Sequence, residues 1–60
     1  MNTYTIVIDV DGGAAFHHTR VEVESANDCE TAERNALARL REEYKNTVAF
    51  FNVDKICINR

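Results

Sequence analysis

The sequence predicts an α+β domain: an antiparallel three-stranded sheet with one helix packed on one face, in the order ββαβ. Apolar residues recur at every second position before Ser25, which is typical of strands. From Asn27 to about Lys45 they recur at helical spacing, and a final apolar stretch closes the chain. The chain has 60 residues, so we expect one domain spanning residues 1–60.

The first strand is expected from Thr3 to Val10, because polar and apolar residues alternate there. Its apolar side chains all fall on one face, and they are Tyr4, Ile6, Ile8 and Val10. Asp11, Gly12 and Gly13 follow, and these residue types tolerate the positive φ that a tight hairpin turn requires. We therefore expect this strand to lead into a hairpin.

The second strand is expected from about Ala14 to Glu24, but its apolar residues change phase. Val21 and Val23 share one face, whereas Phe16 falls on the other face together with His18 and Arg20. Either Phe16 lies on the opposite sheet face or a β-bulge switches the phase between them. We favour the first interpretation, because a bulge would have to be assumed.

One amphipathic helix is expected from Asn27 to about Lys45, with Asn27 as a capping residue paired with Glu30. Two pairs of opposite charge stand four residues apart on this helix, Glu30 with Arg34 and Arg39 with Glu43. The predicted inward-facing residues are Cys29, Ala32, Ala36, Leu37, Leu40 and Tyr44.

The last segment, Val48 to Asn59, is strand-like but also changes phase. Phe51 and Val53 have one parity, and Ile56 and Ile58 have the other. One bulged strand gives ββαβ, whereas a short hairpin turning at residues 52–55 gives ββαββ. The segment contains no glycine, which disfavours the tight hairpin, so we choose ββαβ.

Composition limits the class of protein. The net charge of −3 disfavours a general nucleic-acid binder, which normally carries a basic surface. The amino terminus lacks the features of a secretory signal, and no apolar stretch is long enough to cross a membrane, so we expect a cytoplasmic protein. In a reducing compartment Cys29 and Cys57 are expected to be reduced core residues; a disulfide or a metal site is the alternative.

No catalytic motif is found in the sequence. His17 and His18 are adjacent in a strand and should point to opposite faces, so we do not expect them to share a metal ion. Cys29 is the more reactive cysteine candidate because it lies at a helix start, but a chain of this size offers little room for a substrate pocket. We therefore predict neither enzymatic activity nor a metal or cofactor.

The architecture favours binding, because one helix covers only one face of the sheet. The uncovered face is expected to carry some of Val7, Phe16 and His18, with one of Phe50 or Phe51, and such a patch marks a partner protein or a homodimer interface. An exposed edge strand would offer a second route to pairing. A row of basic helix residues could contact phosphates, although interleaved glutamates favour an ordinary solvated face. The predicted partner-binding residues are Phe16, His18, Arg20, Arg34 and Arg41.

The run from Arg20 to Ser25, followed by a helix with alanines at 32 and 36, resembles small proteins of bacterial viruses and mobile elements, several anti-CRISPR proteins among them. The resemblance covers about residues 3–45 and is architectural. It implies a stoichiometric inhibitor that occupies a surface of a host nucleoprotein or defence complex in the bacterial cytoplasm. No binding residue is transferred, because no diagnostic motif matches. The alternatives are a nucleic-acid-binding protein that uses the basic helix face and a homodimeric structural or regulatory subunit.

Overall fold

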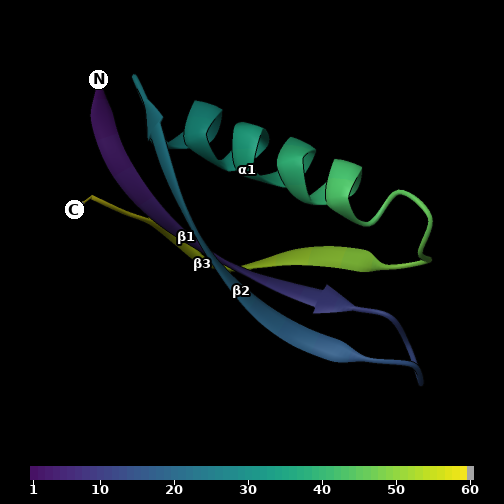
Figure 1. Cartoon of the computed structure of the whole chain (residues 1–60). Coiled ribbons are helices and arrows are strands. Elements are labelled where there is room, and N and C mark those ends of the chain that lie inside the picture. The colour runs from purple at the N-terminus through teal and green to yellow at the C-terminus, as the bar shows by residue number, and fades with distance from the viewer. Residues whose placement is uncertain (60) are drawn as a thin grey trace.

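The computed structural model describes residues 1–59, and the side chains of residues 1–54 and 57. Its elements are β1 (Asn2–Asp11), β2 (His17–Ala26), α1 (Cys29–Glu43) and β3 (Phe50–Asn59). The strands form one antiparallel sheet in the order β2-β1-β3, and α1 lies across one face of it (Figure 1). The predicted α+β class, ββαβ order and three-stranded sheet are confirmed.

The core lies between α1 and the central strand. The even-numbered side chains of β1 face the helix, and its alanines allow a close approach to them. Among the side chains that the structure describes, the fully or almost fully buried ones are Ile6, Ile8, Val10, Ala26, Ala32, Ala36 and Leu40. Leu37 and Tyr44 pack against this cluster, so the predicted inward stripe of the helix is confirmed.

The N-cap of the helix lies one residue later than predicted, at Asp28 and not at Asn27. Asp28 is the N-cap, and its carboxylate accepts a hydrogen bond of 2.7 Å from the backbone N–H of Thr31. This bond lowers the pKa of Asp28, because it stabilises the ionised carboxylate. The negative charge of Asp28 also interacts favourably with the positive end of the helix dipole, an interaction that the neutral side chain of Asn27 lacks.

The last segment is a single strand, as predicted. β3 pairs with β1 throughout, with register shifts between Thr5 and Val7 and between Val7 and Ile8. Each shift inserts one extra residue in β3, so the two together restore the original parity: odd residues of β3 lie opposite even residues of β1 at both ends, as in Val53 with Ile8 and Asn59 with Tyr4. The side chains of residues 56 and 58, on which that prediction also depended, lie outside the described side chains.

The hairpin between β1 and β2 is closed by an unusual contact. The chain turns over residues 12–16, where the N–H of Gly12 donates to the carbonyl of Phe16 at 2.9 Å. The Phe16 ring lies directly over Gly12, and a β-carbon there would approach the ring to 2.2 Å. Gly13 has a φ of 70°, which a residue with a side chain rarely adopts. Each glycine is therefore required for a different reason.

Candidate functional site

The described side chains enclose no site, so candidate binding residues have to lie on the surface. No pocket is found in the part of the chain that the structure describes. Among the same residues, no group of three or more His, Cys, Asp or Glu side chains is arranged around a metal position. No helix there has both the length and the apolar character to cross a membrane. The candidate site is therefore sought on the molecular surface.

We call the face of the sheet that α1 does not cover the open face. It carries the odd-numbered residues of β1 and β2, because the β1–β2 register pairs odd residues with odd residues. Val7 lies directly opposite Val21, and Val23 lies opposite Thr5. Val21 and Val23 are 59% and 49% exposed, whereas Val7 on the central strand is half-buried. The centre of the open face is thus apolar and formed by three β-branched side chains.

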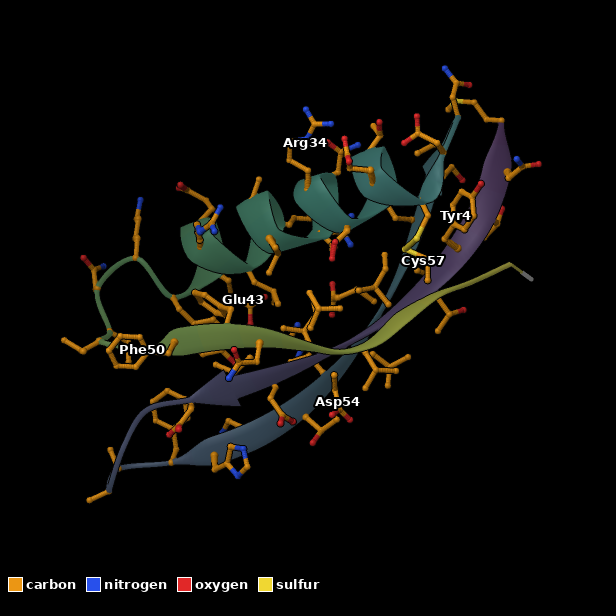
Figure 2. The ribbon with its side chains drawn as sticks, turned by 180° about the vertical axis from the view of Figure 1, so that it is seen from behind. Tyr4, Arg34, Glu43, Phe50, Asp54 and Cys57 are labelled. Carbon is orange, nitrogen blue, oxygen red and sulfur yellow. A yellow bond between two sulfur atoms is a disulfide. The ribbon has the colours of Figure 1, made fainter. Side chains whose placement is uncertain are left out.

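Acidic groups lie at one end of the open face. Asp9 accepts a hydrogen bond of 3.3 Å from the Thr19 hydroxyl and lies 3.9 Å from the imidazole of His17. Asp11 accepts a bond of 2.8 Å from the backbone N–H of Gly13. Figure 2 shows Asp54 on the side of the sheet away from the helix, and its neighbours in β3 pair with Val7 and Ile8, so it lies nearer the middle of the sheet than Asp9 and Asp11 do. The open face therefore combines an apolar centre with an acidic end.

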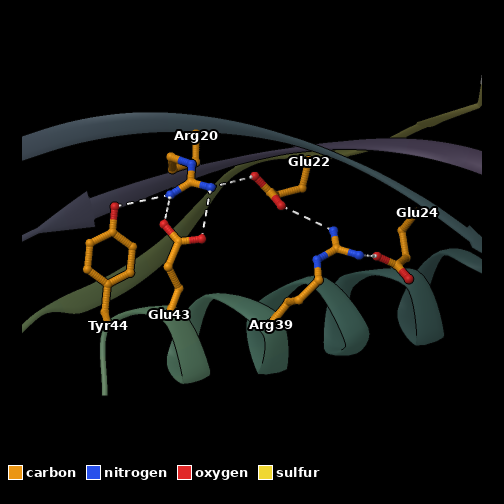
Figure 3. Close-up of polar contacts among 6 residues, drawn as sticks. All are labelled: Arg20, Glu22, Glu24, Arg39, Glu43 and Tyr44. Carbon is orange, nitrogen blue, oxygen red and sulfur yellow. Dashed lines mark hydrogen bonds and ion pairs between the residues drawn. The ribbon is translucent and has the colours of Figure 1, made fainter. Parts of the chain in front are cut away.

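The helix-facing side of β2 is polar. Five residues alternate in charge between α1 and β2, and we call them the charge ladder: Glu43, Arg20, Glu22, Arg39 and Glu24 (Figure 3). Arg20 lies 2.6 Å from Glu43 and 3.4 Å from Glu22. Arg39 lies 3.1 Å from Glu22 and 2.5 Å from Glu24. The ladder therefore joins α1 to β2 by ion pairs.

The ladder holds partly buried charge. The carboxyl side chains of Glu22 and Glu24 are only 13% and 15% exposed, so each would be costly to bury without its arginine. Hydrogen bonds from Arg20 to Glu43 and to the Tyr44 hydroxyl raise the pKa of Arg20 above its ordinary value. The Arg20 bond lowers the pKa of Glu43. Both shifts favour the charged forms of Arg20 and Glu43, so this pair is ionised at neutral pH.

The structure corrects the predicted placement of Phe16, His18 and Arg20. They were expected on the uncovered face, but all three lie on the side that α1 covers. The Phe16 ring packs against the core, with centroids 6.0 Å from Tyr44 and 5.2 Å from His18. The reason is the register: even residues of β2 lie opposite Ile6, Ile8 and the other even residues of β1, which the helix covers.

The relative phase of β2 was nevertheless predicted correctly. Phe16 does lie on the face opposite Val21 and Val23, and no register shift interrupts the β1–β2 ladder. His17 and His18 also point to opposite faces, as expected, because His17 approaches Asp9 and His18 stacks on Phe16. The two phenylalanines of the last segment divide in the same way. Phe50 lies opposite Asp11 and is 69% exposed, whereas Phe51 packs against the core.

The two predicted arginines of the helix lie on its exposed side. Arg34 is 3.9 Å from Glu30, which confirms that predicted pair. Arg41 is exposed and has no ion pair within the described side chains. The predicted Arg39–Glu43 pair is wrong, because both residues instead reach across to β2. The structure therefore separates Arg34 and Arg41 from Phe16, His18 and Arg20, and does not bring the five together.

The cysteines form a disulfide, which corrects the expectation that both are reduced. Cys29 opens α1 and Cys57 lies in β3, with Cα atoms 5.6 Å apart (Figure 2). This separation is within the usual range for a disulfide. The bond ties the helix start to an edge strand 28 residues away in sequence.

Val21 and Val23 lie at the centre of the open face, but they are not among the partner-binding residues predicted from the sequence. One signal could have identified them, namely the number of residues in the hairpin turn, because it decides which face of β2 continues the apolar face of β1. With Gly12 opposite Phe16, even residues of β2 pair with even residues of β1, and the two valines are left on the open face.

No family model, no curated protein and no solved structure matches this chain.

Proposed function

We propose that this protein is a non-enzymatic interaction module that binds another protein through its open face. The observation that carries the proposal is the exposure of Val21 and Val23 beside Val7 on a face that no described element covers. Apolar surface that is contiguous and rimmed by polar groups is typical of protein–protein interfaces.

The charges suggest which kind of partner would fit. Asp9, Asp11 and Asp54 would favour a partner whose contact surface is basic at its rim, since complementary potentials steer association and exclude wrong partners. Proteins that handle nucleic acid carry such surfaces. Together with the architectural resemblance described above, this favours an inhibitor, encoded by a phage or mobile element, that occupies a host nucleoprotein or defence complex in the manner of anti-CRISPR proteins.

A pull-down with two matched variants tests this function. Tagged wild-type protein, Val23→Lys and the double variant Arg34→Ala/Arg41→Ala are incubated with bacterial lysate, with and without nuclease, and the bound proteins are identified by mass spectrometry. Val23→Lys places a charge at the apolar centre of the open face, whereas the double variant alters only the exposed side of the helix. We expect a stoichiometric partner with the wild type and the double variant, and at least a tenfold loss with Val23→Lys, as for an interface hot spot.

Two results would contradict the proposal. A partner retained equally by Val23→Lys would mean that the open face does not bind it. Recovery that depends on nucleic acid and is lost in the double variant would favour the alternative of nucleic-acid binding through the helix, with steep salt dependence. Circular dichroism of each variant establishes that it is folded before its binding is compared.

A further inference from the structure

The outer edge of β2 is a regular pairing surface that the proposed function does not use. β2 is an edge strand of ten residues, and its ladder with β1 runs from end to end without a register shift. The other edge strand, β3, is interrupted by two register shifts. Irregular edges resist pairing with other chains, whereas long regular edges invite it.

The hydrogen bonds determine which backbone groups point outward from this edge. The bond between Gly12 and Phe16 marks a hydrogen-bonded pair of the β1–β2 ladder. Such pairs alternate along antiparallel strands, so the even residues of β2 bond to β1. The N–H and C=O groups of its odd residues therefore point away from β1. A second antiparallel strand can add here only if it pairs its own outward-pointing residues with them.

We propose that β2 pairs with β2 of a second copy of this chain, with Val21 opposite Val21. The outward groups belong to odd residues in both copies, so odd residues must lie opposite odd residues. In this register, Arg20 of each copy lies opposite Glu22 of the other, and His18 lies opposite Glu24. These are non-hydrogen-bonded pairs, in which side chains of opposite strands approach most closely.

The charges disfavour the neighbouring registers. Moving the centre of the pairing by one residue in either direction places it at Glu22 or at Arg20. Glu22 then lies opposite Glu22 of the other copy in the first case, and Arg20 lies opposite Arg20 in the second. Moving the centre by two residues, to Val23 or to Thr19, places Glu22 opposite Glu24 or His18 opposite Arg20. Like charges that lie directly opposite each other are destabilising. Of these registers, only pairing at Val21 sets no two carboxylates and no two basic side chains opposite each other, and it leaves both helices on one side of a continuous six-stranded sheet.

Variants at Val21 test the dimer. Proline at this position removes the outward N–H, so the symmetric pair of central hydrogen bonds is lost while the bonds to β1 remain. By sedimentation equilibrium we expect the wild type and Val21→Thr to form dimers as concentration rises, and Val21→Pro to stay monomeric. A wild-type protein that is monomeric over the whole micromolar range would overturn the proposal, as would a dimer that survives in folded Val21→Pro.

Spin labels test the register without proline, so the proposal stays testable if Val21→Pro fails to fold. Labels are attached at His17→Cys or Ser25→Cys with the native disulfide intact, and the distance between the two copies is measured. Pairing at Val21 predicts equal backbone distances for the two sites, about 27 Å each. Pairing at Glu22 would give about 34 Å at position 17 and about 20 Å at position 25. Unequal distances, or no intermolecular coupling, would overturn the proposal.

Discussion

Reduction of the Cys29–Cys57 disulfide is expected to lower the free energy of unfolding by about 3.5 kcal/mol. The bond joins residues 28 apart, and cross-linking a loop of that length restricts the unfolded chain substantially. A domain of this size rarely has more than about 3–5 kcal/mol of net stability, so the reduced chain should be close to its unfolding midpoint. Urea denaturation followed by circular dichroism, with and without reductant, measures the difference.

The double variant Cys29→Ser/Cys57→Ser is the control for this experiment. It removes the bond without any reductant, so its unfolding curve should coincide with that of the reduced wild type. A loss below about 1 kcal/mol in both would show that the sheet and helix alone hold the fold.

Leu40→Ala is expected to destabilise the domain by about 2–5 kcal/mol. Leu40 is only 1% exposed and is the largest helix residue in the core. Its neighbours on the same helix stripe are Ala32 and Ala36, which are too small to fill the space that truncation leaves. The loss therefore combines a transfer term with a cavity term. Thermal or urea unfolding of the oxidised protein measures it.

Leu37→Ala is the matched comparison for this prediction. Leu37 lies on the same helix and packs against the core, but it is only partly buried. The same chemical change should therefore cost clearly less than at Leu40. Equal losses at the two positions would contradict the assignment of Leu40 to the centre of the interface between helix and sheet.

Sequence periodicity was sufficient to predict the elements. β1 alternates cleanly, α1 has a continuous apolar stripe, and the absence of glycine near residue 52 indicated one strand at the end of the chain. Each of these signals is local, and local signals decide which element forms. The cysteine pairing is not local, because nothing in a spacing of 28 residues indicates that the two side chains meet.

The faces of β2 could not be assigned from the same signals. Charged side chains normally face solvent, so Arg20, Glu22 and Glu24 indicated an uncovered face. They face the helix because Arg39 and Glu43 supply partners of opposite charge. Polar residues can therefore occupy a covered face when the opposing element neutralises them. This reciprocal arrangement becomes visible only when both elements are placed together.

The face assignment of β2 is the central claim, because both the open face and the register of β2 pairing depend on it. Nuclear Overhauser spectra of the oxidised protein test it most directly. The structure predicts contacts from the Tyr44 ring to the Phe16 ring and to the Arg20 side chain, and none from α1 to the methyl groups of Val21 and Val23. Contacts from α1 to those methyl groups, without contacts between Tyr44 and Phe16, would contradict the account.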